Sequence, residues 1–235
     1  MRHPFPLKPP FFEFGPKAYL YGETMLNLAR AIDASAIRHD VDVILTVGYT
    51  DIRPVADNTQ RVKVFAPHMD PLPIGAGSGA VLAEAIKEAG AVGVQLNHCE
   101  KPLSLDVLEQ TIRRADEVGL ATMACADSVE DVKAIAAMGP NVLVAEPTEL
   151  IGTGTTSDAS YVLETIAAVQ ALNPNIMVLQ AAGISNGRDV YNVIRQGAQG
   201  TGCSSGIAKA GDPAAMAEEM IRSVRKAWDD IHVNH

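Results

Sequence analysis

The sequence contains few cysteines and no long apolar run, and each shortage excludes a class of protein. Its three cysteines, Cys99, Cys125 and Cys203, form no CxxC pair, so we expect no disulfide framework and a reducing, cytoplasmic environment. All three are expected to be small, buried apolar residues. No stretch approaches the roughly 20 apolar residues of a membrane span, so we expect no contact with a membrane.

Positively charged residues are also in the minority. The chain has 19 Lys and Arg against 28 Asp and Glu, and the resulting net charge of −9 disfavours a nucleic-acid partner. A small phosphate remains a candidate ligand, because backbone N–H groups can bind it in an acidic protein. Prolines interrupt the first residues, MRHPFPLKPPFF, where a signal peptide needs a helical apolar core. We therefore expect no export, and an extended arm over residues 1–10.

What the sequence does contain is an alternation of short apolar segments with longer amphipathic ones. Most of the short segments lack polar alternation, which is typical of parallel strands buried on both faces. The predicted strands are 11–14, 41–47, 62–66, 91–96, 120–126, 141–145, 176–182 and, mainly from its position, 197–203. Helical apolar spacing occupies 103–119, 157–173 and 212–231, whereas Pro54 weakens the helix expected over 50–60. Eight such units without a linker predict a single (β/α)8 barrel domain over 1–235, in preference to a doubly wound sheet.

In such a barrel the active site lies at the C-terminal ends of the strands. The polar residues predicted to lie there are Lys17, His68, Asp70, His98, Glu100 and Glu146. Loops rich in glycine and serine follow the last three strands, at 151–154, 181–187 and 203–209. Glycines permit tight turns, but adjacent loops of this kind also form phosphate sites through backbone N–H groups. We therefore predict acids and bases on the early loops and a phosphate site on the late ones.

Three of these residues have the properties of an acid–base site. His98 ends a strand shortly before a helix, where the helix dipole favours the neutral imidazole; a purely structural histidine is equally compatible. Lys17 can neutralise developing negative charge, or remain a solvated loop residue, and Glu100 can bond to Lys17 or to backbone. A Cys99–His98 nucleophilic pair is disfavoured because neighbouring side chains diverge. A desolvated Glu146 would be a good proton acceptor, with Gly152 and Gly154 hinging a lid.

Several segments resemble the triosephosphate isomerase family, and its short archaeal-type branch in particular. The segment AEPTELIGTG is similar to the loop that carries the family's glutamate base, and NHCE is similar to its His-Ser-Glu segment with Cys99 replacing serine. GPKAYLYG resembles the segment of the substrate-binding lysine, and GISNG and CSSGIAKAGDP resemble the phosphate loops. The likeness extends from Phe14 to Pro213.

The resemblance assigns a role to each candidate residue. It implies that Lys17 stabilises charge, that His98 is a neutral electrophile and that Glu146 is the base. This pairing of a base with a neutral histidine is established for the family. We count Glu100 with these catalytic residues because it can set the local electrostatics. Phosphate would be held by Gly152, Ser185, Ser204 and Ser205. The implied reaction interconverts dihydroxyacetone phosphate and glyceraldehyde 3-phosphate with no metal or organic cofactor. The resemblance also implies a homo-oligomer, either a dimer or a tetramer.

Two departures from the family pattern leave the substrate open. Gly15 stands where an asparagine is usual, which leaves more space near the reacting centre and allows a larger sugar phosphate such as a tetrulose phosphate. AGSG, after the third strand, stands where the short branch usually has a His-Thr pair, in a segment that normally reaches a neighbouring subunit. Either subunit packing or substrate fit would then differ.

Two further functions compete with the isomerase. A metal-dependent lyase or hydrolase could use His68, Asp70, His98 and Glu100, since imidazole and carboxylate groups bind divalent ions. That function gives Glu146 and its loop no role. A phosphate-metabolite binding protein that lost catalysis through Gly15 is the other alternative.

Overall fold

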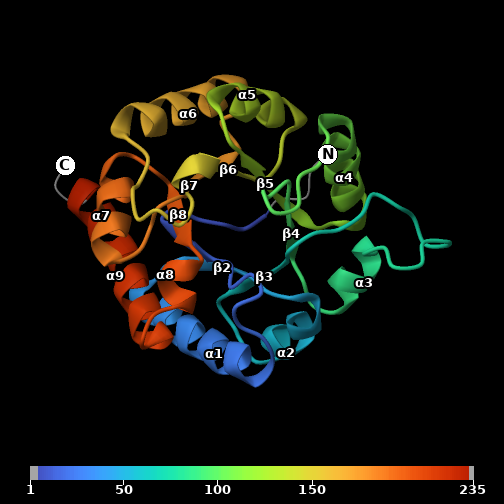
Figure 1. Ribbon diagram of the computed structural model, residues 1–235, viewed down its shortest axis with the longest axis horizontal. Coiled ribbons are helices and arrows are strands. Elements are labelled where there is room, and N and C mark those ends of the chain that lie inside the picture. Colours follow the sequence, from blue (N-terminus) through green and yellow to red (C-terminus); the bar gives the residue numbers. More distant parts are fainter. Residues whose placement is uncertain (1–4, 233–235) are drawn as a thin grey trace.

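Eight parallel strands close into a barrel, described by a computed structural model over residues 5–232 (Figure 1). Each strand pairs with the next in sequence, and β8 pairs with β1 to complete the ring. The strands are β1 (Phe11–Phe14), β2 (Asp42–Thr46), β3 (Lys63–Ala66), β4 (Gly93–Leu96), β5 (Ala121–Ala126), β6 (Val142–Ala145), β7 (Met177–Gln180) and β8 (Gly200–Cys203). The predicted (β/α)8 barrel is therefore confirmed, including the eighth strand.

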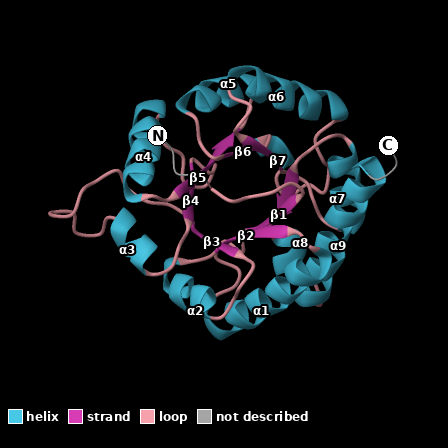
Figure 2. Cartoon of the chain, turned by 180° about the vertical axis from the view of Figure 1, so that it is seen from behind, coloured by secondary structure: helices cyan, strands magenta, loops and turns pink. Residues whose placement is uncertain are grey.

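Helices surround the barrel and cover its outer face (Figures 1 and 2). They are α1 (Gly22–His39), α2 (Ile52–Asp57), α3 (Ala83–Glu88), α4 (Leu105–Val118), α5 (Val129–Met138), α6 (Ala159–Leu172), α7 (Gly187–Arg195), α8 (Ser205–Ala208) and α9 (Pro213–His232), with short 3-10 turns at η1 (Tyr49–Asp51) and η2 (Thr148–Leu150). Pro54 is the third residue of α2, where its missing N–H leaves no helical hydrogen bond unmade. No described helix has the length and apolar character needed to cross a membrane.

The inside of the barrel is filled by side chains from alternate strand positions. Phe11 and Phe65 are fully buried there, and the opposing strand positions are Gly200 and Gly93. A Cβ at Gly200 would lie 2.4 Å from the Phe11 ring, and one at Gly93 would lie 2.3 Å from the Phe65 ring. Glycines on β4 and β8 thus make room for phenylalanines on β3 and β1.

The segment before β1 crosses one opening of the barrel (Figure 2). Leu7 is buried in the interior cluster, and the Phe5 ring lies 5.5 Å from the Phe65 ring. Because this segment precedes β1, it covers the N-terminal ends of the strands, away from the end where barrel sites form. The predicted arm over 1–10 therefore packs against the barrel from Phe5 onward, and its residues 1–4 lie outside the described residues.

Candidate active site

A cavity of about 920 Å³ opens at the C-terminal ends of the strands. All eight of the site residues predicted from the sequence line this one cavity: Lys17, His98, Glu100, Glu146, Gly152, Ser185, Ser204 and Ser205. They come from the segments that follow five strands, β1, β4, β6, β7 and β8. The barrel therefore brings together the acids, bases and glycine-rich loops that the sequence predicted separately.

Lys17 lies in the cavity and pairs with Glu100. Its Nζ is 2.8 Å from Glu100 Oε1, and its backbone has a φ of 51°, which is uncommon for a residue with a side chain. Burial disfavours the ammonium, but the hydrogen bond and the charge of Glu100 outweigh it and raise the Lys17 pKa. The same lysine lowers the Glu100 pKa. Both groups are thus charged at neutral pH, and the ammonium is held toward the cavity.

The surroundings of His98 select one neutral tautomer. The backbone N–H of Glu100 donates to Nδ1 at 3.1 Å, so Nδ1 carries no proton and Nε2 carries one. Burial and the positive charge of Lys17 both lower the His98 pKa. Asn97 holds the start of this loop, because its side chain donates to the Cys125 carbonyl and accepts from the Leu103 N–H. His98 can therefore donate a hydrogen bond from Nε2 into the cavity.

Cys99 differs from both of its sequence predictions. It is exposed, whereas all three cysteines were expected to be buried, because it lies on the loop after β4 rather than within a strand. Its Sγ lies 3.8 Å from His98 Nδ1, so the neighbouring side chains do approach each other. Partial desolvation of the thiol and the charge of Glu146 nevertheless raise the Cys99 pKa. The group is a neutral thiol rather than an activated thiolate.

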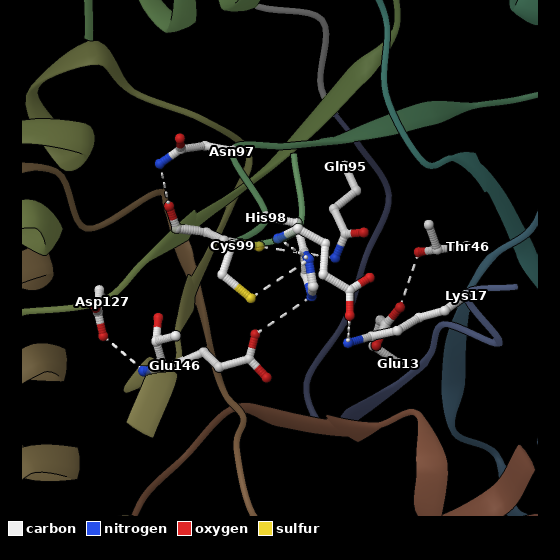
Figure 3. Close-up of polar contacts among 12 residues, drawn as sticks. Glu13, Lys17, Thr46, Gln95, Asn97, His98, Cys99, Asp127 and Glu146 are labelled. Atoms are coloured by element: carbon white, nitrogen blue, oxygen red, sulfur yellow. Dashed lines mark hydrogen bonds and ion pairs between the residues drawn. The ribbon is translucent and has the colours of Figure 1, made fainter. Parts of the chain in front are cut away.

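Glu146 follows β6 and points into the cavity toward His98 (Figure 3). Its Oε2 lies 3.9 Å from His98 Nε2, and its side chain is 17% exposed. Burial raises the Glu146 pKa, and Lys17 opposes this rise. A carboxylate with a raised pKa is a stronger base than one in water, so Glu146 and His98 form a proton acceptor and a proton donor facing the same space.

The loop after Glu146 is held firmly at its start and is open farther along. The backbone N–H of Thr148 donates to Asp127 at 2.7 Å, and the Tyr161 hydroxyl donates to the Asp127 carbonyl at 2.8 Å. Gly152 and Gly154 have φ values of 73° and 74°, and no atom lies within 4 Å of where a Cβ would stand on either. These positions require glycine for their backbone conformation rather than for space.

The loops after β7 and β8 form the other side of the cavity. Gly183 has a φ of 70°, and a Cβ there would lie 1.9 Å from the Thr155 carbonyl oxygen, so its loop packs directly on the end of the Glu146 loop. Ser185 donates to Asp189 through its hydroxyl at 2.7 Å. Ser204 Oγ is buried and has no hydrogen-bond partner among the described residues. A polar atom of this kind, beside glycine-rich backbone, is available to an anionic ligand.

The four residues of the metal-site alternative do not converge. His68 Nε2 lies 3.2 Å from Asp70 Oδ1, while Glu100 is paired with Lys17. Over residues 5–232, no group of three or more metal-binding side chains is arranged to hold one ion. The arrangement therefore favours acid–base chemistry by Glu146 and His98.

Glu13, Thr46 and Lys209 are among the cavity-lining residues that the sequence analysis did not predict. Thr46 Oγ1 donates to Glu13 Oε1 at 2.9 Å. Glu13 follows Phe11 by two residues, so strand alternation could have placed it inside the barrel. Lys209 Nζ lies 4.8 Å from the Tyr19 ring centre. Lys209 belongs to the segment CSSGIAK, which the sequence analysis singled out, but only the fold shows that its side chain lines this cavity.

Glu13 should make the stability of the protein fall as pH rises. Burial is the largest cause that raises its pKa, from 4.5 to about 8. Between these values the folded protein keeps a proton that the unfolded chain loses, so the free energy of unfolding decreases by about 1.4 kcal/mol per pH unit. Above pH 8 the effect levels off. Urea unfolding from pH 5 to 9 measures the free energy of unfolding of wild type and of Glu13→Gln, and the difference between the two should show this slope. The control Glu149→Gln removes an exposed carboxylate and should have the same pH dependence of stability as wild type. If the difference between wild type and Glu13→Gln does not change with pH, Glu13 is ionised in the folded protein.

Fold and site together define a class: a (β/α)8-barrel protein whose cavity is lined by a glutamate, a histidine and a lysine beside glycine-rich loops. The family model for triosephosphate isomerase matches residues 16–220 of the chain. This chain belongs to the triosephosphate isomerase family, as the sequence resemblance predicted.

Archaeal relatives cover nearly the whole chain. The triosephosphate isomerase of Methanosarcina barkeri is 37% identical over 220 residues, which is 92% of this chain and 99% of that protein. That of Saccharolobus solfataricus is 33% identical over 225 residues, covering 94% and 99%. The crystal structure of the Bartonella henselae enzyme matches with a TM-score of 0.76 and 16% identity over 93% of this chain and 100% of that one, which shows the shared fold.

Proposed function

We propose that this protein is an aldose–ketose isomerase that interconverts dihydroxyacetone phosphate and glyceraldehyde 3-phosphate. The observation that carries the proposal is the placement of Glu146 Oε2 3.9 Å from His98 Nε2 in one cavity, with Lys17 alongside. Membership of the triosephosphate isomerase family supplies the substrate.

In this mechanism Glu146 moves one proton between adjacent carbons. Its carboxylate takes a proton from C1 of the ketose and returns it to C2, while His98 Nε2–H donates to the oxygen that becomes negatively charged. Lys17 stabilises the enediolate that forms between the two transfers. The mechanism uses only side chains of this chain and needs no metal or organic cofactor.

The phosphate group is assigned to the late loops. Backbone N–H groups near Gly152, Ser185, Ser204 and Ser205 would hold it, together with the unpartnered hydroxyl of Ser204. Closure of the Glu146 loop would remove water from the reacting carbons, as loop closure does in this family.

We also propose that the enzyme is a cytoplasmic dimer or tetramer. The segment between β3 and α3 extends away from the barrel (Figure 1), and Ile74 within it is 72% exposed. An apolar side chain on a projecting segment is suited to contact with a second copy. The three free cysteines are compatible with a reducing compartment.

Proton exchange in deuterated water tests the isomerase directly. The wild-type protein should catalyse deuterium incorporation into dihydroxyacetone phosphate, and should do so equally well after EDTA treatment. The readout is the ¹H NMR signal of the C1 protons. Loss of activity with EDTA would favour the metal-dependent alternative, and tight phosphate-ester binding without exchange would favour a binding protein.

A further inference from the structure

The rim of the cavity carries a lysine to which the proposed mechanism assigns no role. Lys209 follows α8, is exposed to solvent and lines the same cavity as Glu146. Among residues 5–232, the lysines that form an ion pair with a carboxylate are Lys17 and Lys226, so no carboxylate within that range cancels the charge of Lys209. A cation of this kind, lining a cavity of an acidic chain, is suited to an anionic ligand.

Tyr19 holds the Lys209 ammonium at this rim. The Lys209 Nζ lies 4.8 Å from the centre of the Tyr19 ring, which is within range of a cation–π interaction. The backbone N–H of Tyr19 donates to the Pro16 carbonyl at 3.0 Å, so the ring extends from a turn that also contains Lys17. An aromatic face attracts a cation but carries no net charge. The contact therefore localises the ammonium and leaves its full positive charge available, which a carboxylate partner would not do.

The closure of the barrel places this pair beside the loops assigned to the phosphate. Tyr19 follows β1 and Lys209 follows β8, and these two strands pair with each other. Figures 1 and 2 show α8, which ends before Lys209, nearer to the barrel than α9. The Lys209 N–H donates to the Ser205 carbonyl at 3.0 Å, so the lysine lies one turn after Ser205. Side chains in a helical turn lean toward its N-terminus, which directs this lysine toward the buried, unpartnered hydroxyl of Ser204.

Charge distinguishes Lys209 from the other lysines of the cavity. Lys17 and Lys101 also line it, but Lys17 is paired with Glu100, and Lys101 follows β4, which lies across the barrel from β8. A phosphate monoester carries a charge of about −1.5 to −2 at neutral pH. The chain itself has a net charge of −9, which opposes the approach of such a ligand. An unpaired ammonium beside the phosphate loops reverses this repulsion locally.

We propose that Lys209, held at the rim by Tyr19, is a substrate-binding residue whose ammonium captures the phosphate dianion and binds it together with the loops after β7 and β8. This inference rests on the proposed isomerase function and adds a binding residue to it. The phosphate stays bound through both proton transfers, so its contact with Lys209 is the same before and during the reaction. Loss of the ammonium therefore weakens binding and leaves the chemical step unchanged.

The first test removes the charge of Lys209 and measures steady-state kinetics with dihydroxyacetone phosphate. Lys209→Met should lower kcat/KM by about 10-fold, mainly through a higher KM, and should change kcat by less than about twofold. Lys209→Arg keeps the charge and should stay within about threefold of wild type. The matched control is Lys133→Met, which removes an exposed lysine of α5 that does not line the cavity, and it should behave like wild type.

Two further measurements separate capture of the phosphate from a structural role of Lys209. Raising the ionic strength from about 0.01 to about 0.15 M shortens the screening length from about 30 to about 8 Å. Over this range kcat/KM should fall by a larger factor in wild type than in Lys209→Met, because the variant has lost the attracting charge. D-Glyceraldehyde lacks the phosphate, so its C2 proton should exchange in deuterated water at the same rate in both proteins.

The contribution of the aromatic ring is tested with two variants of Tyr19. Tyr19→Leu removes the ring that localises the Lys209 ammonium and should reproduce part of the loss in kcat/KM seen in Lys209→Met. Tyr19→Phe keeps the ring and should retain most of the wild-type value, since the cation–π contact needs only the aromatic face. Equal losses in the two variants would show that Tyr19 acts through its hydroxyl group and would refute its role in holding Lys209.

The remaining outcomes distinguish this inference from the proposed function. If Lys209→Met has the kcat/KM of wild type for dihydroxyacetone phosphate, or loses as much activity on D-glyceraldehyde, Lys209 does not capture the phosphate and the proposed function stands. If the wild type isomerises no triose phosphate, the proposed function fails, and a ³¹P NMR titration with inorganic phosphate decides the inference separately. Phosphate should then bind about 10-fold more weakly to Lys209→Met than to wild type, and equal binding would overturn the inference.

Discussion

Replacing Glu146 with glutamine is expected to lower kcat for triose-phosphate isomerisation by about 10³-fold, with KM changed by less than about threefold. The amide occupies the same volume but cannot accept a proton from carbon, so the loss belongs to the chemical step. Steady-state kinetics with each triose phosphate measure both constants. Glu149→Gln, which removes an exposed carboxylate two residues past Pro147, is the matched control and should behave like wild type.

A second variant of the same residue separates geometry from basicity. Glu146→Asp keeps the carboxylate but withdraws it by about one ångström, and a displacement of this size costs about 10²-fold in rate. In the wild type, kcat/KM should rise with pH through a pKa above the ordinary range of a glutamate, because burial raises the pKa of Glu146. A rate independent of Glu146 in both variants would assign the base to another group.

Replacing His98 with glutamine is expected to lower kcat by about 10²-fold or more, because the developing negative charge loses its Nε2–H donor. Glutamine can still donate a hydrogen bond, but from a different position and without the orientation that the Glu100 N–H imposes on Nδ1. His39→Gln is the matched control, since His39 bonds to Glu218 and does not line the cavity. Equal kcat values for wild type and His98→Gln would remove His98 from the mechanism.

The protonation state of His98 can be observed directly. Because burial and Lys17 both lower its pKa, ¹⁵N NMR above the ordinary pKa of a histidine, at about pH 7 to 8, should show one protonated nitrogen, Nε2, and one unprotonated nitrogen, Nδ1. An imidazolium spectrum in that range would contradict the neutral electrophile. Lys17→Met, which removes a nearby positive charge, should raise the His98 pKa.

The stretch from Glu146 to Gly154 shows how much of the site the local sequence can predict. A carboxylate directly after an apolar strand, followed by proline and glycines, was enough to predict a base at the root of a loop. The backbone agrees locally, since Gly152 and Gly154 both require positive φ values. The stretch could not predict the hydrogen bond from the Thr148 N–H to Asp127, because that bond joins segments 21 residues apart.

The sequence by itself determined the barrel, the strand order and the eight candidate residues at the strand ends. It could do so because the apolar periodicity and the glycine-rich loops are local properties of the chain. Only the tertiary structure decided which groups share the cavity and which protonation state each of them has. Glu100 sets the tautomer of His98, and Glu13 is buried between Gly15 and Gly202 across the closure of β1 with β8. Protonation depends on burial and on charges from distant strands, and neither exists until the barrel has closed.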